Sequence, residues 1–160
     1  MLSNSSRPGH ALPLLLLRAF QELIDELHTE LAHTGHPDAR PMHGFVLQAV
    51  GPEGTTAVEL ARALGVTKQA AGRTVAGLEE QGYLVRATDP ADSRRKVVRL
   101  STRGQDLLER SAAVLDDLRR RRADTVGADR LAALEDTLAA LGGGAGPRWD
   151  APAWFGTRPD

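Results

Sequence analysis

Four polar side chains lie within a stretch of seven residues and have the chemistry to bind nucleic acid: Thr67, Lys68, Gln69 and Arg73. A Gln side chain can form two hydrogen bonds with adenine, and an Arg side chain can do so with guanine. Thr and Lys at the start of a helix suit a phosphate group. If residues 67–81 form a helix, we expect these four side chains to face outward from its first turns and to enter a DNA major groove.

A second basic group, Arg94 and Arg95, follows a polar stretch rich in turn-forming residues (88–95). An Arg side chain on a narrow, extended loop can enter a minor groove, where the negative potential of DNA is deepest. Asp92 lies in the same loop, and we expect it to brace Arg94 through a charge-assisted hydrogen bond.

The elements that must position these residues are marked by local signals. Thr56 and Glu59 have the spacing of a capping box and predict a short helix to about residue 64. Gly65 predicts a tight turn, Thr67 is a typical N-cap, and Gly82 predicts a left-handed end of the second helix. Strand-like runs at 83–86 and 96–100 predict a β-hairpin. The shared core of the two helices is expected to be Leu60, Ala61, Leu64, Val66, Ala71, Val75 and Leu78.

An ordinary helical hairpin with a solvated charged face would have a similar sequence. The basic β-hairpin directly after it favours nucleic-acid binding. Charge is also segregated along the chain, because residues 62–103 carry nine Lys or Arg against four Asp or Glu, although the whole chain has 20 against 21. The absence of Cys excludes thiolate chemistry and Cys-based metal sites, and it fits a cytoplasmic protein.

Leu- and Ala-rich helices are predicted on both sides of this segment. Residues 12–33, 41–50 and 102–123 have helical spacing, and four leucines predict a last helix that ends at Gly142. On 102–123 one face of the predicted helix carries Leu108, Ser111, Leu115, Leu118 and Arg122. The run of leucines at 14–17 is far too short for a membrane span. These apolar faces suggest a homodimer, and packing within one chain is the alternative.

Residues 40–105 resemble the winged helix-turn-helix of the MarR (multiple antibiotic resistance regulator) family. The matching stretches are Glu59-Leu60-Ala61, Leu64-Gly65-Val66-Thr67-Lys68-Gln69, Leu78 to Leu84, Asp89-Pro90-Ala91-Asp92-Ser93-Arg94 and Val98 to Gly104. The resemblance implies an obligate homodimer of interleaved terminal helices. It also implies that Thr67, Lys68, Gln69 and Arg73 read the major groove and that Arg94, oriented by Asp92, reads the minor groove.

One departure from the family pattern concerns Gly72, which stands where the family often has a small polar residue, so a base contact at that point is lost. Gly72 and Gly77 together cost the helix ~1–2 kcal/mol relative to Ala, and the sequence offers no reason for Gly77. Regulators of this type commonly sense small phenolic or anionic molecules in a cleft between the dimer helices and the winged domain. By placement, the candidate ligand residues are Arg18, His28, His43 and Phe45.

The predicted fold is therefore mainly α: a winged helix-turn-helix of three helices plus a β-hairpin wing, with N- and C-terminal helices that form a dimerisation region. The expected divisions are a flexible N-terminus (1–10), the dimerisation region (11–35 and 102–142), the DNA-binding domain (40–101) and a tail (143–160) that contains Trp149 and Trp154. The His residues have no usual zinc spacing, so neither a metal nor another cofactor is expected.

The sequence thus predicts a dimeric, cytoplasmic regulator of transcription that binds double-stranded DNA at a pseudo-palindromic operator, with residues 67–81 in the major groove and 88–96 in the minor groove. A ligand-responsive repressor is the expected form. The alternative is a winged-helix module that binds proteins without reading DNA. An enzyme is not expected, because the chain has no nucleophile elbow, phosphate loop or HExxH motif.

Overall fold

The computed structural model describes residues 7–89, 91–92 and 94–142. The fold is mainly helical, as predicted, with one antiparallel β-hairpin. In chain order the elements are α1 (Ala11–His33), α2 (Pro41–Val50), α3 (Ala57–Leu64), α4 (Lys68–Glu80), β1 (Leu84–Thr88), β2 (Lys96–Leu100), α5 (Thr102–Val126) and α6 (Ala128–Leu141).

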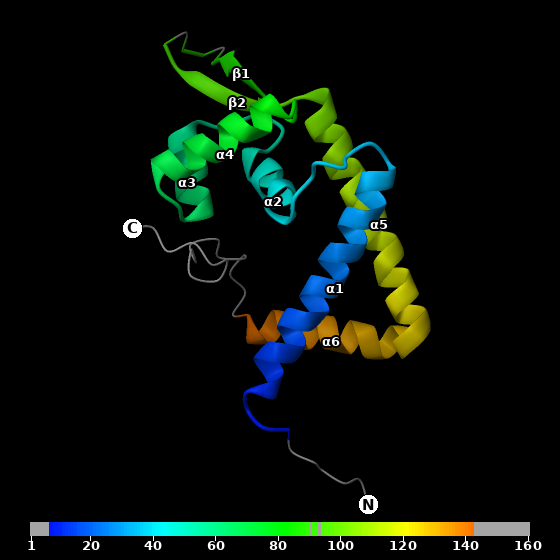
Figure 1. Ribbon diagram of the computed structural model, residues 1–160. Coiled ribbons are helices and arrows are strands. Elements are labelled where there is room, and N and C mark those ends of the chain that lie inside the picture. The colour runs from blue at the N-terminus through cyan, green and yellow to red at the C-terminus, as the bar shows by residue number, and fades with distance from the viewer. Residues whose placement is uncertain (1–6, 90, 93, 143–160) are drawn as a thin grey trace, which may run out of the picture.

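These elements form two parts (Figure 1). Helices α2, α3 and α4 gather beside the hairpin, and we call residues 40–101 the winged unit. Helices α1 and α5 extend away from this unit and α6 crosses their far end, and we call these three helices the arm. Each predicted helix is present, so the helical periodicity and the cap signals of the sequence were sufficient to find them.

The local signals explain the winged unit. The Thr56 hydroxyl accepts a hydrogen bond from the Glu59 N–H, and the Glu59 carboxylate accepts one from the Thr56 N–H, which completes the capping box of α3. Gly65 ends α3 with a φ of 65°, in the left-handed region that glycine tolerates best. Thr67 then caps α4 by accepting from the Ala70 N–H.

The wing is a two-stranded ribbon that is fixed to the start of α3. Strands β1 and β2 pair from Leu84 opposite Leu100 to Thr88 opposite Lys96. Thr55, just before α3, forms two backbone hydrogen bonds with Val98 of β2 at 2.9 and 2.7 Å. Because the ribbon is hydrogen-bonded on both sides of β2, its base moves with the helix-turn-helix.

The core runs continuously from the winged unit into the arm. Its buried residues come from α1 to α5 and include Leu27, Leu31, Leu47, Leu60, Leu64, Val75, Leu78, Leu84, Leu107 and Leu118. The predicted shared core of α3 and α4 is confirmed, with Val66 at its edge.

One detail of the sequence prediction was wrong. The first strand begins at Leu84 rather than residue 83, because the Tyr83 N–H bonds back to the Leu78 carbonyl and closes α4. On α5, Leu107 and Leu118 are buried in the core, whereas Leu115 is 41% exposed. Leu108, Ser111 and Leu115 of the predicted face border a cleft, and Leu108 also packs against the core.

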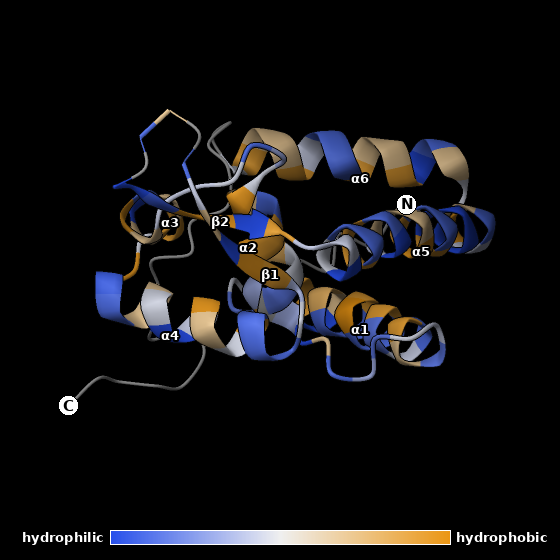
Figure 2. Cartoon of the chain, turned by 90° about the horizontal axis from the view of Figure 1, so that it is seen from above, coloured by the Kyte–Doolittle hydropathy of each residue, from blue (hydrophilic) through white to orange (hydrophobic). Residues whose placement is uncertain are grey.

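The arm carries many apolar side chains that this single chain does not cover. Figure 2 shows hydrophobic residues along α1 and α6 as well as inside the winged unit. Large exposed side chains in the arm are Leu12, Leu14, Leu15, Leu16, Leu17, Phe20, Leu115, Val126, Leu134, Leu138 and Leu141. None of the described helices is long and apolar enough to cross a membrane.

The run of four arginines on α5 pairs with acids inside the arm. Arg119 forms a bidentate ion pair with Glu135 of α6, and Arg122 forms an ion pair with Glu26 of α1. Asp117 on the same helix accepts from both Arg120 and Arg121. The run therefore helps to join the three helices of the arm.

Candidate nucleic-acid interface

The second helix of the helix-turn-helix, α4, presents the four predicted side chains to solvent. Thr67, Lys68, Gln69 and Arg73 are all exposed, whereas Ala71, Val75 and Leu78 on the opposite side are buried against α3. Ala61 is 6% exposed at the crossing of the two helices, where a larger side chain would separate them. The outer face of α4 thus has the shape and the donors and acceptors that a major groove requires.

Arg94 lies exposed near the tip of the wing, where hydrogen bonds shape the turn on either side of it. The Asp92 carboxylate accepts from the Arg94 backbone N–H at 3.0 Å, and the Arg95 N–H donates to the Asp92 carbonyl at 2.9 Å. Asp92 thus braces Arg94 through its backbone N–H, where we had expected a bond to the side chain. Pro90 and Ser93 lie outside the described residues.

Arg95 has a different environment from Arg94. Its guanidinium contacts Glu59 of α3 at 2.6 Å and Asp89 at 3.4 Å. Hydrogen bonds from the backbone and side chain of Thr56, together with the charge of Arg95, lower the pKa of Glu59 to about 2. One carboxylate therefore caps α3 and also holds the turn of the wing through Arg95. DNA binding by Arg95 stays a prediction, and the geometry gives it a role in positioning Arg94.

A polar cluster that sequence reasoning missed joins the arm to the winged unit. His36, in the loop between α1 and α2, is 3% exposed; its Nε2 lies 2.8 Å from Asp106 Oδ2 of α5 and its Nδ1 lies 3.2 Å from the Tyr83 hydroxyl. The Tyr83 hydroxyl donates to Asp38 Oδ1 at 2.6 Å. The Arg103 guanidinium binds the same Asp38 oxygen and lies over the Tyr83 ring, 4.7 Å from its centroid.

Contacts within this cluster keep Tyr83 protonated and Asp38 ionised by shifting their pKa values. Burial, followed by the hydrogen bond to Asp38, raises the pKa of Tyr83 to about 12. Burial alone would raise the pKa of Asp38, but the bonds from Tyr83, the backbone and Arg103 lower it below its ordinary value. Because the Tyr83 N–H bonds the Leu78 carbonyl at the end of α4, the cluster links the α1–α2 loop, the end of α4 and the start of α5.

We expect replacement of Tyr83 by Phe to lower the free energy of unfolding by about 1–3 kcal/mol. The change removes a buried hydroxyl that bonds a carboxylate and leaves Nδ1 of His36 without its partner. Urea unfolding at a fixed protomer concentration measures the difference. Stability equal to that of the wild-type protein would mean that the hydrogen bonds of the Tyr83 hydroxyl do not stabilise the contact between the arm and the winged unit.

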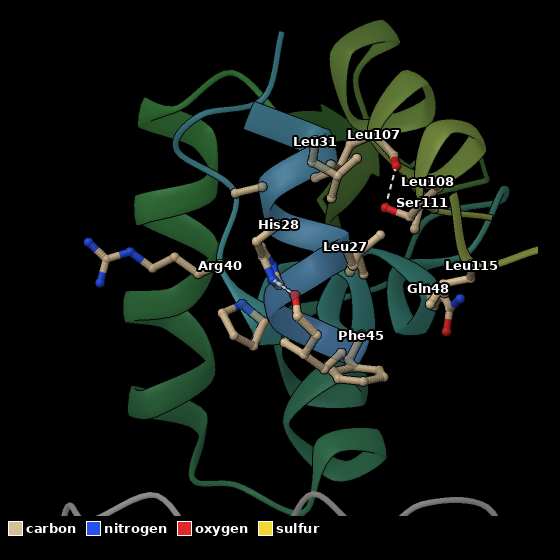
Figure 3. A pocket seen from close by; sticks show the side chains of 14 residues that line it. Leu27, His28, Leu31, Arg40, Phe45, Gln48, Leu107, Leu108, Ser111 and Leu115 are labelled. Atoms are coloured by element: carbon tan, nitrogen blue, oxygen red, sulfur yellow. Dashed lines mark hydrogen bonds between the residues drawn. The ribbon is translucent and has the colours of Figure 1, made fainter. Parts of the chain in front are cut away.

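A cleft of about 490 Å³, including the solvent at its mouth, lies between α1, α2 and α5. Figure 3 shows two of the predicted ligand residues, His28 and Phe45, on its wall with Leu27, Leu31 and Leu107. Nδ1 of His28 lies 2.6 Å from the Ile24 carbonyl oxygen, so this nitrogen donates within the helix. Arg40 and Ser111, which the prediction did not include, also line the cleft.

The other two predicted ligand residues lie elsewhere. Arg18 forms an exposed ion pair with Glu22 on α1. His43 lines a separate groove beside α4, and its Nδ1 accepts from the Arg40 N–H at 3.2 Å. Within the part of the chain that the structure describes, no three His, Asp or Glu side chains are grouped to hold a metal ion.

Comparisons with known proteins agree with this architecture. Residues 40–95 match the model of the MarR family. The apo form of wild-type MarR from E. coli is 26% identical, with a TM-score of 0.61 over 81% of this chain and 96% of that one. CouR from Rhodococcus jostii RHA1, bound to p-coumaroyl-CoA, is 24% identical with a TM-score of 0.61, and covers 86% of this chain and 95% of its own.

A MepR variant from S. aureus, bound to an oligodeoxyribonucleotide, is 20% identical with a TM-score of 0.58 over 81% of this chain and 94% of that one. These likenesses extend over the arm as well as the winged unit. Residues 40–95 thus match the model of the MarR family, and the chain as a whole resembles solved MarR-family regulators in fold.

Proposed function

We propose that the protein is a dimeric, DNA-binding regulator of transcription that acts as a ligand-responsive repressor. The observation that carries the proposal is that one basic unit exposes the outer face of α4 and the wing-tip Arg94 together. A helix flanked by an extended basic loop can occupy a major groove and the adjacent minor groove at the same time. The MarR family and the MepR variant bound to an oligodeoxyribonucleotide support this function.

In this proposal, residues 40–101 are the DNA-binding domain, and residues 11–35 and 102–142 form the dimerisation region. The exposed leucines of α1 and α6 support a dimer, because an apolar surface of this extent on one chain marks an interface. Two copies related by a twofold axis would place their α4 helices on half-sites about one helical turn apart. The operator would then be a pseudo-palindrome.

The cleft between α1, α2 and α5 is the proposed effector site. Its wall is mostly apolar, with His28, Gln48 and Ser111 as polar groups, which suits a small phenolic or anionic molecule, and the Arg40 guanidinium at its edge points away from it (Figure 3). CouR, bound to p-coumaroyl-CoA, supports an effector of this class. The cleft touches both the arm and α2, so a bound molecule could change how the winged unit sits on the arm.

Replacing Arg94 by Ala tests the function. We expect the affinity for an operator duplex to fall by about 10- to 100-fold, because the wing loses its minor-groove contact, while the dimer stays folded. Fluorescence anisotropy with a duplex selected by the wild-type protein measures the affinity. Arg7→Ala, which removes an exposed charge before α1 and outside both proposed units, is the control and should change the affinity little.

Wild-type affinity of the Arg94→Ala protein would refute the role of the wing. A module that binds proteins without reading DNA is the alternative function. It would predict weak binding to every duplex, with no sequence enriched from a random pool.

A further inference from the structure

A second groove lies between the start of α2 and the side of α4 that is turned toward α2, next to the proposed major-groove surface. It encloses about 1010 Å³, including the solvent at its mouth. Arg40, Pro41 and His43 line it on one side. Residues on the side of α4 that is turned toward α2 line the other: Arg73, Thr74, Gly77, Leu78 and Gln81.

Gly77 is the residue that opens this groove. A Cβ atom built at Gly77 meets nothing within 4 Å, and Gly77 is not one of the glycines with a positive φ. Neither packing within the chain nor the backbone conformation therefore requires glycine, although glycine costs a helix interior about 1 kcal/mol relative to Ala. An external group that approaches α4 closely would account for the missing side chain.

The groove carries positive charge that the rest of the protein does not neutralise. Of the seven arginines in the winged unit, two form ion pairs among the described residues: Arg86 with Glu79 and Arg95 with Glu59. Neither Arg40 nor Arg73 forms an ion pair with a carboxylate of the described residues. Both side chains are exposed. Two unpaired guanidinium groups on different helices thus border one groove.

His43 adds no charge to this groove. Its Nδ1 accepts a hydrogen bond from the Arg40 N–H, which requires that this nitrogen carry no proton. Burial and the nearby Arg40 lower the pKa of His43 below its ordinary value. The net charge of the groove near neutral pH therefore comes from the two arginines.

A groove with apolar walls and two cations suits a chain of alternating apolar sugars and anionic phosphates. Arg73 already belongs to the predicted major-groove surface, so the groove continues that surface onto α2. We propose that the groove holds a segment of DNA sugar–phosphate backbone beside the major groove, with Arg40 as a phosphate-binding residue. This inference rests on the proposed function of α4 as the recognition helix.

Replacing Arg40 by Gln tests the proposal on the full-length dimer. We expect binding to weaken about 3- to 10-fold for the operator and for single-mismatch duplexes alike, because a phosphate contact carries no sequence information. The slope of log K against log salt should fall by about one, since one fewer counterion contact is made per site. Arg7→Gln, at an exposed position before α1 and outside both proposed units, is the matched control and should leave both the affinity and the slope unchanged.

Two further measurements locate the contact. In ethylation interference, phosphates that block binding of the wild-type protein in each half-site should lose this effect with Arg40→Gln. Gly77→Leu should fill the groove and weaken binding without unfolding the protein, because Leu favours the helix and the space beside it is open. Circular dichroism and sedimentation check that both variants stay folded and dimeric.

The outcomes separate this inference from the proposed function. If Arg94→Ala weakens binding but Arg40→Gln keeps the wild-type affinity, salt slope and interference pattern, DNA reading stands and the groove is not a backbone site. The same result would be expected if the groove held a small organic anion instead of DNA. If Arg94→Ala has no effect either, the proposed function itself fails.

Discussion

Replacing Leu16 and Phe20 together by Glu is expected to convert the protein to a monomer and to weaken operator binding by about 1000-fold or more. Both side chains lie one turn apart on α1 and are exposed in the single chain, at 40% and 41%. A twofold dimer would bury them, and carboxylates in an apolar interface cannot keep their hydration. A monomer holds only one half-site, so it loses most of the free energy of specific binding.

Sedimentation equilibrium and anisotropy with the same duplex measure this prediction together. Gln21→Glu adds a carboxylate at an exposed position of the same helix, and it should leave both the dimer and its affinity nearly unchanged. A dimer that persists in the double variant would show that α1 is not the interface. A monomer that binds the operator as tightly as the wild-type protein would show that dimerisation is not needed for DNA reading.

Replacing Gly104 by Ala is expected to lower the free energy of unfolding by about 3 kcal/mol. A Cβ atom at this position would lie 2.2 Å from the Tyr83 carbonyl oxygen, which is backbone and cannot swing aside. The start of α5 would have to move away from the end of α4. The Ser101 hydroxyl, which caps α5 through the Gly104 N–H and also donates to the Gly82 carbonyl, would lose its geometry.

Urea unfolding of Gly104→Ala against Gly72→Ala tests this expectation. A Cβ atom at Gly72 meets nothing within 4 Å, so Ala there should stabilise the protein by about 1 kcal/mol through its helix propensity. The two variants make the same chemical change, but the free energy of unfolding should fall in Gly104→Ala and rise in Gly72→Ala. Equal stability of Gly104→Ala and the wild-type protein would contradict the close approach of α5 to Tyr83.

The winged unit could be predicted from the sequence because its signals are local. Thr56 and Glu59 are three residues apart, and Gly65 and Gly82 each mark a helix end within the same short segment. The polar cluster between the arm and the winged unit could not be predicted, because its contacts join residues that are far apart in the sequence. His36 and Asp106 are 70 residues apart, and neither residue type indicates a partner.

In the candidate site, too, features with a local sequence signal could be predicted and contacts between distant residues could not. Exposure of Gln69 on α4 follows from helix periodicity, whereas the ion pair of Arg95 with Glu59 spans 36 residues and depends on how the wing folds back onto α3. His43 was placed in the ligand cleft by its position in the chain, but the rotation of α2 turns it toward α4. Trp149 and Trp154 lie outside the described residues.

Selection of bound duplexes from a random pool tests the central claim most directly. The wild-type dimer should enrich an inverted repeat whose half-sites are centred about one helical turn, roughly 10–10.5 base pairs, apart. Gln69→Ala and Arg73→Ala should each lower the preference for one base at a defined position of each half-site, by ~1–3 kcal/mol of binding free energy. Enrichment of no motif, or the same motif from the wild-type and both variant proteins, would contradict the reading of DNA by α4.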